Sequence, residues 1–173
     1  MGVRLEIFCQ NSESSEFLEV NRIGEELFNY LQQEEIEQAF DRANSPGNSS
    51  AKVQEVFLKK ALELGFQSEK KNLFSNIPTS NLRPDYFRKI GDTGIIIEVE
   101  RGKTIMNNMD ILDMWKCHLC FSANHLFLFV PNQLKHNHNS ASYDCFKKVS
   151  NRLSPFFKKP NFINVNSLWL FGY

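Results

Sequence analysis

The stretch from residue 83 to residue 101 places the tightest limit on how this chain can fold. Residues 86–90 have the composition of a strand, and two glycines bracket a turn at residues 91–94. Three consecutive isoleucines then open a second extended segment over residues 95–100. Because β-branched side chains favour extended backbone and glycine favours tight turns, this stretch predicts a β-hairpin.

The surrounding sequence predicts helices and strands in alternation. Apolar residues recur at helical spacing in four stretches, namely residues 22–42, 50–64, 105–121 and 141–153. Residues 125–130 are too continuously apolar to be half-exposed, so we expect a strand buried on both faces, and residues 167–171 predict a last strand. A short strand is also possible at residues 66–71. This order predicts an α/β fold with a central mixed sheet flanked by helices.

Length and composition predict one domain. A chain of 173 residues with 42% hydrophobic content can bury a sizeable core. We expect a single domain over residues 1–173, with a helical extension at residues 1–45 and the core at residues 50–173. No run of 18 apolar residues and no secretory signal is present, so we expect a cytoplasmic protein without a membrane span and with reduced thiols.

The charges are balanced overall but unevenly distributed. Twenty basic and twenty acidic residues give a formal net charge of zero, which provides no global electrostatic signature for nucleic acid. The first forty residues are rich in glutamate, whereas the end of the chain is basic. A local basic surface is therefore compatible with the sequence.

Three carboxylates are predicted to meet on the hairpin. Glu98 and Glu100 are two residues apart on one strand and therefore share a face. If the turn is centred on Asp92 and Thr93, Asp85 lies opposite Glu100, and directly paired Cβ atoms are about 5 Å apart. Like charges opposite one another destabilise a sheet, so a divalent cation such as Mg²⁺ or Mn²⁺ is the simplest compensating partner. The alternative is a solvated edge strand, paired with nearby arginine or lysine residues.

The order and spacing of these residues resemble a known pattern. Pro84-Asp85, twelve intervening residues and Glu98-Val99-Glu100 resemble the motif of the PD-(D/E)xK nuclease superfamily, whose restriction-endonuclease-like fold has an αβββαβ core. Asp85 and Glu98 match its two acidic positions. Glu100 stands where lysine is usual, although some restriction enzymes of the superfamily carry glutamate there.

The resemblance implies roles for further residues. Glu55, on the helix before the hairpin, is the candidate for an additional metal ligand, and a solvated helix glutamate is the alternative. Lys116 is the candidate for a lysine displaced onto the following helix, or simply an i,i+3 partner of Asp113. The candidates for contacts with nucleic-acid phosphates directly follow the hairpin: Arg101, Lys103, Asn107 and Asn108.

The expected function is that of a nuclease. The resemblance implies a Mg²⁺-dependent endodeoxyribonuclease, acting on DNA without an organic cofactor, with Asp85, Glu98, Glu100 and Lys116 in catalysis. Cutting both strands of a duplex with one site per chain implies a homodimer. Two alternatives stay open: a catalytically inactive DNA-binding or assembly module of the same fold, and a plain interaction domain with a solvated glutamate pair.

A second metal motif has a simpler explanation. Cys117 and Cys120 have the spacing of a zinc half-site, and His136 and His138 could supply the other half. The two cysteines fall inside a predicted helix, however, whereas structural zinc sites usually place such a pair on a turn. We therefore predict that these cysteines are packed in the core.

Overall fold

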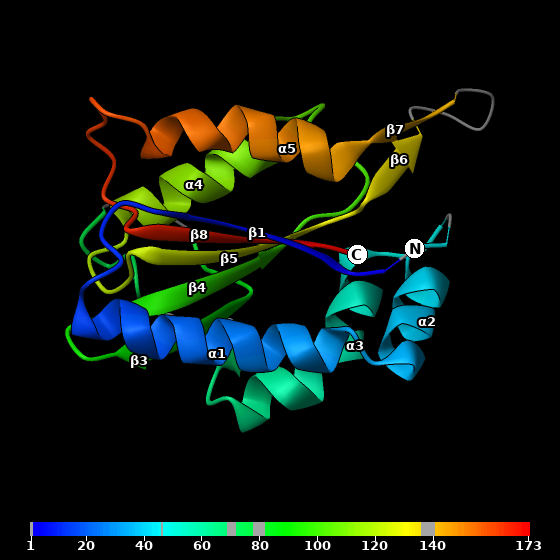
Figure 1. Ribbon diagram of the computed structural model, residues 1–173, viewed down its shortest axis with the longest axis horizontal. Coiled ribbons are helices and arrows are strands. Elements are labelled where there is room, and N and C mark those ends of the chain that lie inside the picture. Colours follow the sequence, from blue (N-terminus) through cyan, green and yellow to red (C-terminus); the bar gives the residue numbers. More distant parts are fainter. Residues whose placement is uncertain (1, 46, 69–71, 78–81, 136–140) are drawn as a thin grey trace.

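The computed structural model is a mixed α/β protein, described for all residues except 1, 46, 69–71, 78–81 and 136–140 (Figure 1). Its central sheet has six strands in the order β1-β8-β5-β4-β3-β2. The strands of this sheet are β1 (Arg4–Cys9), β2 (Gln67–Ser68), β3 (Tyr86–Ile90), β4 (Thr93–Val99), β5 (His125–Val130) and β8 (Ser167–Gly172). The predicted α/β class with a mixed sheet is confirmed.

Helices cover both faces of this sheet (Figure 1). One face carries α1 (Ser15–Leu31), α2 (Glu34–Ala43) and α3 (Ser50–Glu63), and the other carries α4 (Met109–Leu119) and α5 (Cys145–Leu153). A short helix, η1 (Ser154–Phe157), continues α5, and a separate ribbon pairs β6 (Gln133–Lys135) with β7 (Ser142–Asp144). In the described part of the chain, no helix is long and apolar enough to cross a bilayer.

Strand β4 lies in the interior of the sheet, which explains its isoleucine run. It pairs with β3 in antiparallel and with β5 in parallel orientation. Ile95 and Ile97 pack into the core beneath α1, α2 and α3, whereas Ile96 packs into the core beneath α4 and α5. Because successive side chains of a strand point to opposite faces, Glu98 follows Ile96 onto the α4 side.

The hairpin register differs from the prediction. Ile90 pairs with Thr93, so the turn is centred on Gly91 and Asp92 instead of Asp92 and Thr93. Gly91 adopts a φ of 50°, which glycine tolerates better than other residues, and this favours the earlier turn position. The register of β3 and β4 therefore leads Asp85 towards Glu98, and the prediction that Asp85 lies opposite Glu100 is wrong.

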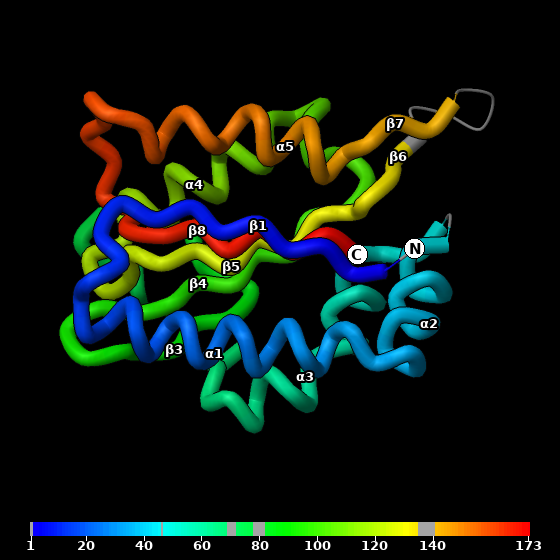
Figure 2. The backbone as a smooth tube through the Cα atoms, viewed as in Figure 1, coloured from blue at the N-terminus to red at the C-terminus, as the bar shows by residue number. Residues whose placement is uncertain are grey.

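The N-terminal segment is more than a helical extension. Strand β1 forms an edge of the central sheet and pairs with β8, so the two ends of the chain run side by side (Figure 2). The alternation of apolar and charged residues over residues 3–7 is the signal that predicts such a strand. Val20, Ile23 and Leu27 of α1 are fully buried in the core. Residues 1–45 thus supply both a strand and helices to the main layers.

Several predicted helices have different limits. The helix expected at residues 22–42 is two helices, because Gln33 adopts an extended backbone conformation between α1 and α2. The helix expected at residues 105–121 begins only at Met109, because Asn108 adopts a left-handed conformation with a φ of 54°. Residues 142–144 pair with β6, so α5 starts at Cys145. Within the strand considered at residues 66–71, residues 67–68 form β2, and residues 69–71 lie outside the described residues.

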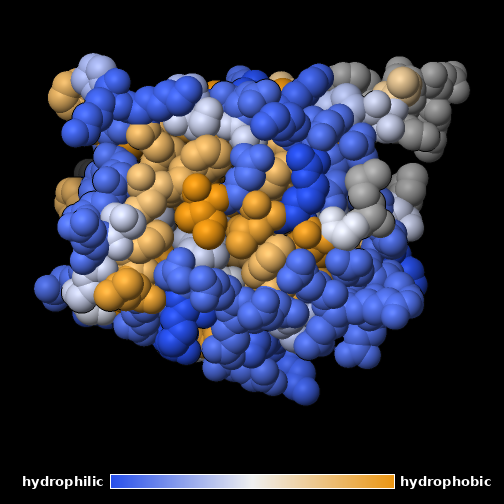
Figure 3. All heavy atoms as spheres, in the orientation of Figure 1, coloured by the Kyte–Doolittle hydropathy of each residue, from blue (hydrophilic) through white to orange (hydrophobic). Residues whose placement is uncertain are grey.

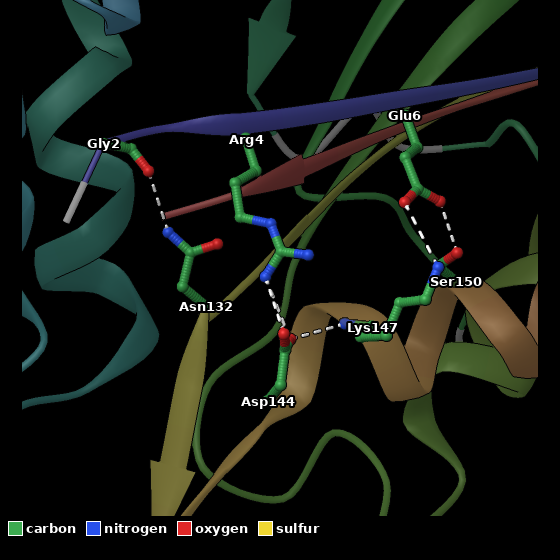
Figure 4. Close-up of polar contacts among 7 residues, drawn as sticks. All are labelled: Gly2, Arg4, Glu6, Asn132, Asp144, Lys147 and Ser150. Atoms are coloured by element: carbon green, nitrogen blue, oxygen red, sulfur yellow. Dashed lines mark hydrogen bonds and ion pairs between the residues drawn. The ribbon is translucent and has the colours of Figure 1, made fainter.

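Polar contacts tie the edge strand β1 to Asp144, the last residue of β7, and to α5 (Figure 4). Arg4 contacts both carboxylate oxygens of Asp144 at 3.0 Å, and Ser150 donates a hydrogen bond to Glu6. On the face shown in Figure 3, hydrophobic residues gather at the centre and left of the view, with hydrophilic residues around them. Strand β1 is therefore held by side chains as well as by its ladder with β8.

Candidate functional site

A carboxylate cluster lies where the hairpin meets α4. The carboxylate cluster comprises Asp85, Glu98, Glu100 and Asp113 together with the ammonium group of Lys116. Lys116 Nζ lies 2.8 Å from Glu98 Oε1 and 3.2 Å from Asp113 Oδ1. Glu98 is 4% exposed and Asp113 is 1% exposed, so this ion-paired centre is buried.

The helix α4 presents two chemically different sides. Asp113 and Lys116 are three residues apart and therefore share the side that faces Glu98. Leu112 and Trp115 lie on the other side and are 51% and 47% exposed. The placement of Lys116 beside Glu98 thus follows from the rotation of α4 about its axis as it packs on the sheet.

Asp85 holds the open end of the hairpin. Its Oδ2 accepts a hydrogen bond of 2.9 Å from the backbone N–H of Val99. This contact comes one residue before β3 begins and at the last residue of β4, so it extends the pairing of the two strands. Asp85 is half-buried and follows the buried Pro84.

Burial and mutual repulsion shift the acidities of the cluster. Burial, followed by the charges of Asp113 and Asp85, raises the pKa of Glu98 well above its usual range, although Lys116 opposes this effect. Burial and the nearby Asp113 raise the pKa of Glu100 to about 8, and burial raises the pKa of Asp113 to about 6. Desolvation disfavours the charge on Lys116, but Glu98 and Asp113 outweigh it and raise the pKa of the ammonium group. The cluster therefore favours binding additional positive charge, as protons or as a cation.

The donor chemistry of this cluster suits a hard divalent cation. Mg²⁺ prefers oxygen ligands such as carboxylates. Two carboxylate oxygens of the cluster, Glu98 Oε1 and Asp113 Oδ2, are buried and have no hydrogen-bond partner. Glu98 Oε1 instead makes its ion pair with Lys116. Within the described residues, no three acidic, histidine or cysteine side chains already form a group that could hold a metal ion. Binding a cation would thus require these carboxylates to draw together.

Glu55, the predicted additional ligand, lies elsewhere. It is exposed on α3 and pairs with Lys52 at 2.8 Å, as a solvated helix glutamate would. Its neighbour Gln54 does reach the hairpin, since its Oε1 accepts a 3.2 Å hydrogen bond from the Tyr86 hydroxyl. In the part of the chain that is described, no contact joins Glu55 to the carboxylate cluster.

The side chain of Arg101 is hydrogen-bonded within the protein. Its guanidinium donates hydrogen bonds to the backbone carbonyls of Asn44, Ser45 and Asn48, in the connection between α2 and α3. These donors are therefore engaged within the protein, and the predicted contact of Arg101 with phosphate would require their release. The sequence carries no local signal for this long-range pairing.

The other predicted phosphate contacts are differently placed. Lys103 and Asn107 are exposed, and Lys103 has no ion-pair partner among the described side chains. Asn108 is also exposed, but its Oδ1 accepts a 2.7 Å hydrogen bond from Arg152. Lys103 and Asn107 thus remain available to a ligand.

The cysteines of α4 are packed in the core. Cys117 is fully buried, Cys120 is nearly so at the end of the helix, and burial raises the pKa of both thiols. His118 Nδ1 accepts a 2.8 Å hydrogen bond from the backbone of Asn164. His136 and His138 lie outside the described residues, so the other half of the considered zinc site is not placed.

Asp113 is the member of the cluster that sequence reasoning does not single out. The available signal is an acidic residue in an apolar helix, three residues from a candidate lysine.

A hollow of about 610 Å³, lined by Thr93, Asn124 and His125 among others, opens at the opposite end of β4 and β5. This hollow is therefore separate from the cluster.

Comparison with known proteins adds no family assignment. No protein-family model matches the chain, and no curated protein sequence matches it.

Proposed function

We propose that this protein is a divalent-metal-dependent nuclease that hydrolyses phosphodiester bonds of DNA. The observation that carries the proposal is the position of Lys116, which lies 2.8 Å from Glu98 and 3.2 Å from Asp113. A lysine is absent from position 100, where the PD-(D/E)xK pattern usually has one. Helix α4 brings a lysine to the same acidic residues from a different part of the chain.

The arrangement of elements supports the same proposal. The chain order α3, β2, β3, β4, α4 and β5 is an αβββαβ order. Strands β2 to β5 are neighbours in the sheet, with β4 and β5 parallel and the earlier pairs antiparallel. Asp85 precedes β3 and Glu98 lies near the end of β4, as the resemblance implies for its two acidic positions.

The carboxylates of the cluster would bind the cation, and they also ionise within reach of it. A bound Mg²⁺ or Mn²⁺ would supply Lewis acidity at the phosphate and lower the pKa of water. Asp85 and Glu98 would hold the cation, with Glu100 beside them, while Asp113 orients the ammonium group of Lys116. In hydrolysis, the oxygen of water bonds to phosphorus and gives up one proton, one P–O bond breaks, and the departing oxygen takes up one proton. In the metal-free protein, burial and the nearby Asp113 raise the pKa of Glu100 to about 8, and a bound cation would lower it again.

The test is cleavage of plasmid DNA with Mg²⁺ or Mn²⁺ by the wild type and by Glu98→Gln, Asp85→Ala and Glu55→Gln. We expect cleavage by the wild type, loss of at least about 100-fold in the first two variants and unchanged activity in the third. Glu55 is the matched control because it is an acidic residue outside the cluster. Absence of cleavage across duplex, single-stranded and RNA substrates would refute the proposal. Equal cleavage by Asp85→Ala would place the activity elsewhere.

A specific observation favours a second candidate, a catalytically inactive DNA-binding module. Lys116 already neutralises Glu98, and no three-ligand metal group is formed within the described residues. Such a module would bind DNA equally well with and without Mg²⁺ and would not cut it. Calorimetry with Mg²⁺ or Mn²⁺ separates the candidates, because only the nuclease requires a cation at Glu98.

A further inference from the structure

The chain after residue 113 is basic, whereas the helices on the other face of the sheet are rich in acidic residues. Residues 15–63, which form α1, α2 and α3, contain ten acidic and five basic residues. After residue 113, the only acidic residue is Asp144, whereas seven residues are basic: Lys116, Lys135, Lys147, Lys148, Arg152, Lys158 and Lys159. Because α5 and η1 lie across the sheet from α1 (Figure 1), the charge asymmetry of the sequence becomes an asymmetry of the molecule.

Some basic side chains of this segment have partners within the protein, and others do not. Arg152 pairs with Asp110 at 2.8 Å, and Lys148 lies 4.2 Å from the centre of the Tyr143 ring. Lys147 lies 3.9 Å from Glu6 of β1 (Figure 4). Lys158 and Lys159, just after η1, are exposed and have no ion-pair partner among the described residues. The uncompensated positive charge is thus concentrated at the end of η1.

An aromatic cleft is lined by residues that flank these two lysines in the chain. The cleft has a volume of about 400 Å³ and lies between α4 and the segment after α5. Its lining is largely apolar: Trp115, His118, Pro155, Phe156, Pro160, Asn161, Phe162 and Ile163. Trp115 is 47% exposed and Phe162 is 94% exposed, so both present ring surface to solvent.

We propose that this aromatic cleft binds an unpaired base of a nucleic-acid strand, with Lys158 and Lys159 contacting the adjacent phosphates. Exposed rings next to unpaired lysines match the two recognition elements of a single strand, a stacking surface for bases and positive charge for the backbone. A paired base inside a duplex cannot stack on these rings. The lysines favour a polyanion over an apolar protein surface as the occupant.

The cleft and the carboxylate cluster share one helix. Trp115 faces the cleft, and the adjacent Lys116 faces Glu98. The proposal rests in part on the nuclease function, because a single-stranded region held beside α4 would be part of that enzyme's substrate. Its binding step involves no member of the cluster and can be measured without a metal ion.

The experiment measures the anisotropy of a fluorescein-labelled twelve-nucleotide oligo(dT) in EDTA, titrated with the full chain. We expect Phe162→Ala and Trp115→Ala each to weaken binding by roughly 5-fold to 150-fold, and Trp115→Phe to restore most of the loss. Phe162 is almost fully exposed, so its truncation leaves the fold intact. Leu18→Ala is the matched control, since Leu18 is 65% exposed on α1.

The lysines have an independent readout. Replacing Lys158 and Lys159 with alanine is expected to reduce the slope of log K against log salt by about 1.4, since each phosphate contact on a single strand contributes about 0.7. Lys59→Ala is the control, because Lys59 is 89% exposed on the other face of the sheet. An unchanged salt slope would overturn the assignment of these lysines to phosphates.

Two further results would overturn the proposal as a whole. One is absence of oligo(dT) binding, or binding that Phe162→Ala leaves unchanged. The other is self-association in sedimentation that Phe162→Ala abolishes, which would make the cleft an interface between copies. The two proposals fail separately: oligo(dT) binding by a wild type that cleaves no substrate would refute the nuclease and retain the cleft, and Asp85→Ala should abolish cleavage while leaving oligo(dT) binding intact.

Discussion

Replacing Lys116 with methionine tests the electrostatic account of the cluster. The substitution keeps most of the alkyl chain and removes the ammonium group between Glu98 and Asp113. The side chains of these partners are 6% and 1% exposed, and that of Lys116 is 16% exposed. Removing one partner of a buried ion pair costs about 3–5 kcal/mol, because the remaining charge is uncompensated. We expect about 3 kcal/mol at pH 8, since the carboxyls can relieve part of the penalty by protonation.

The stability lost in Lys116→Met should be larger at high pH than at low pH. The folded protein raises the pKa of Glu98 and Glu100 above the unfolded values, so it binds more protons than the unfolded chain. Stability of the metal-free protein therefore falls as pH rises, for Glu100 between about 4.5 and about 8. Without Lys116 the carboxyls protonate more readily, so the destabilisation should be smaller at pH 5.5 than at pH 8.

The assay is urea-induced unfolding in EDTA at these two pH values. Lys52→Met is the matched control, because Lys52 forms an i,i+3 pair with Glu55 in which both side chains are more than half exposed. This control should change stability by no more than about 0.5 kcal/mol. A Lys116→Met protein as stable as the wild type at pH 8, or one with the same loss at both pH values, would refute the reasoning.

Three further predictions concern the cation, the packing and the thiols. Mg²⁺ should raise the Tm more at pH 8 than at pH 6, because protons compete for the carboxylates, and Glu98→Gln should abolish the effect in a thermal scan. Gly24→Ala should cost about 1–3 kcal/mol in urea unfolding, since its Cβ would lie 2.5 Å from the Trp169 ring; an unchanged midpoint would contradict this. Cys117 is buried and its thiol has a raised pKa, so a thiol reagent should modify it only on unfolding, well after the partly exposed Cys9.

Local patterns in the sequence determined much of the fold. The isoleucine run and the two glycines predicted the hairpin, helical spacing predicted α3, and continuous apolarity predicted the buried strand β5. These patterns succeed because periodicity and turn chemistry act over a few residues. Glu98 and Glu100 stand out for the same reason, since two acids in an apolar strand conflict with their surroundings.

Tertiary structure decided which groups meet. The rotation of α4 brings Lys116 and Asp113 to Glu98, the hairpin register leads Asp85 to the same place, and Arg101 bonds to carbonyls more than fifty residues away. The fold likewise places the acid-rich helices α1, α2 and α3 across the sheet from the basic segment formed by α5 and η1. Apart from the hairpin register, which the turn at Gly91 sets locally, these pairings depend on how distant elements pack, and the sequence pattern within one element carries no information about its partner across the sheet.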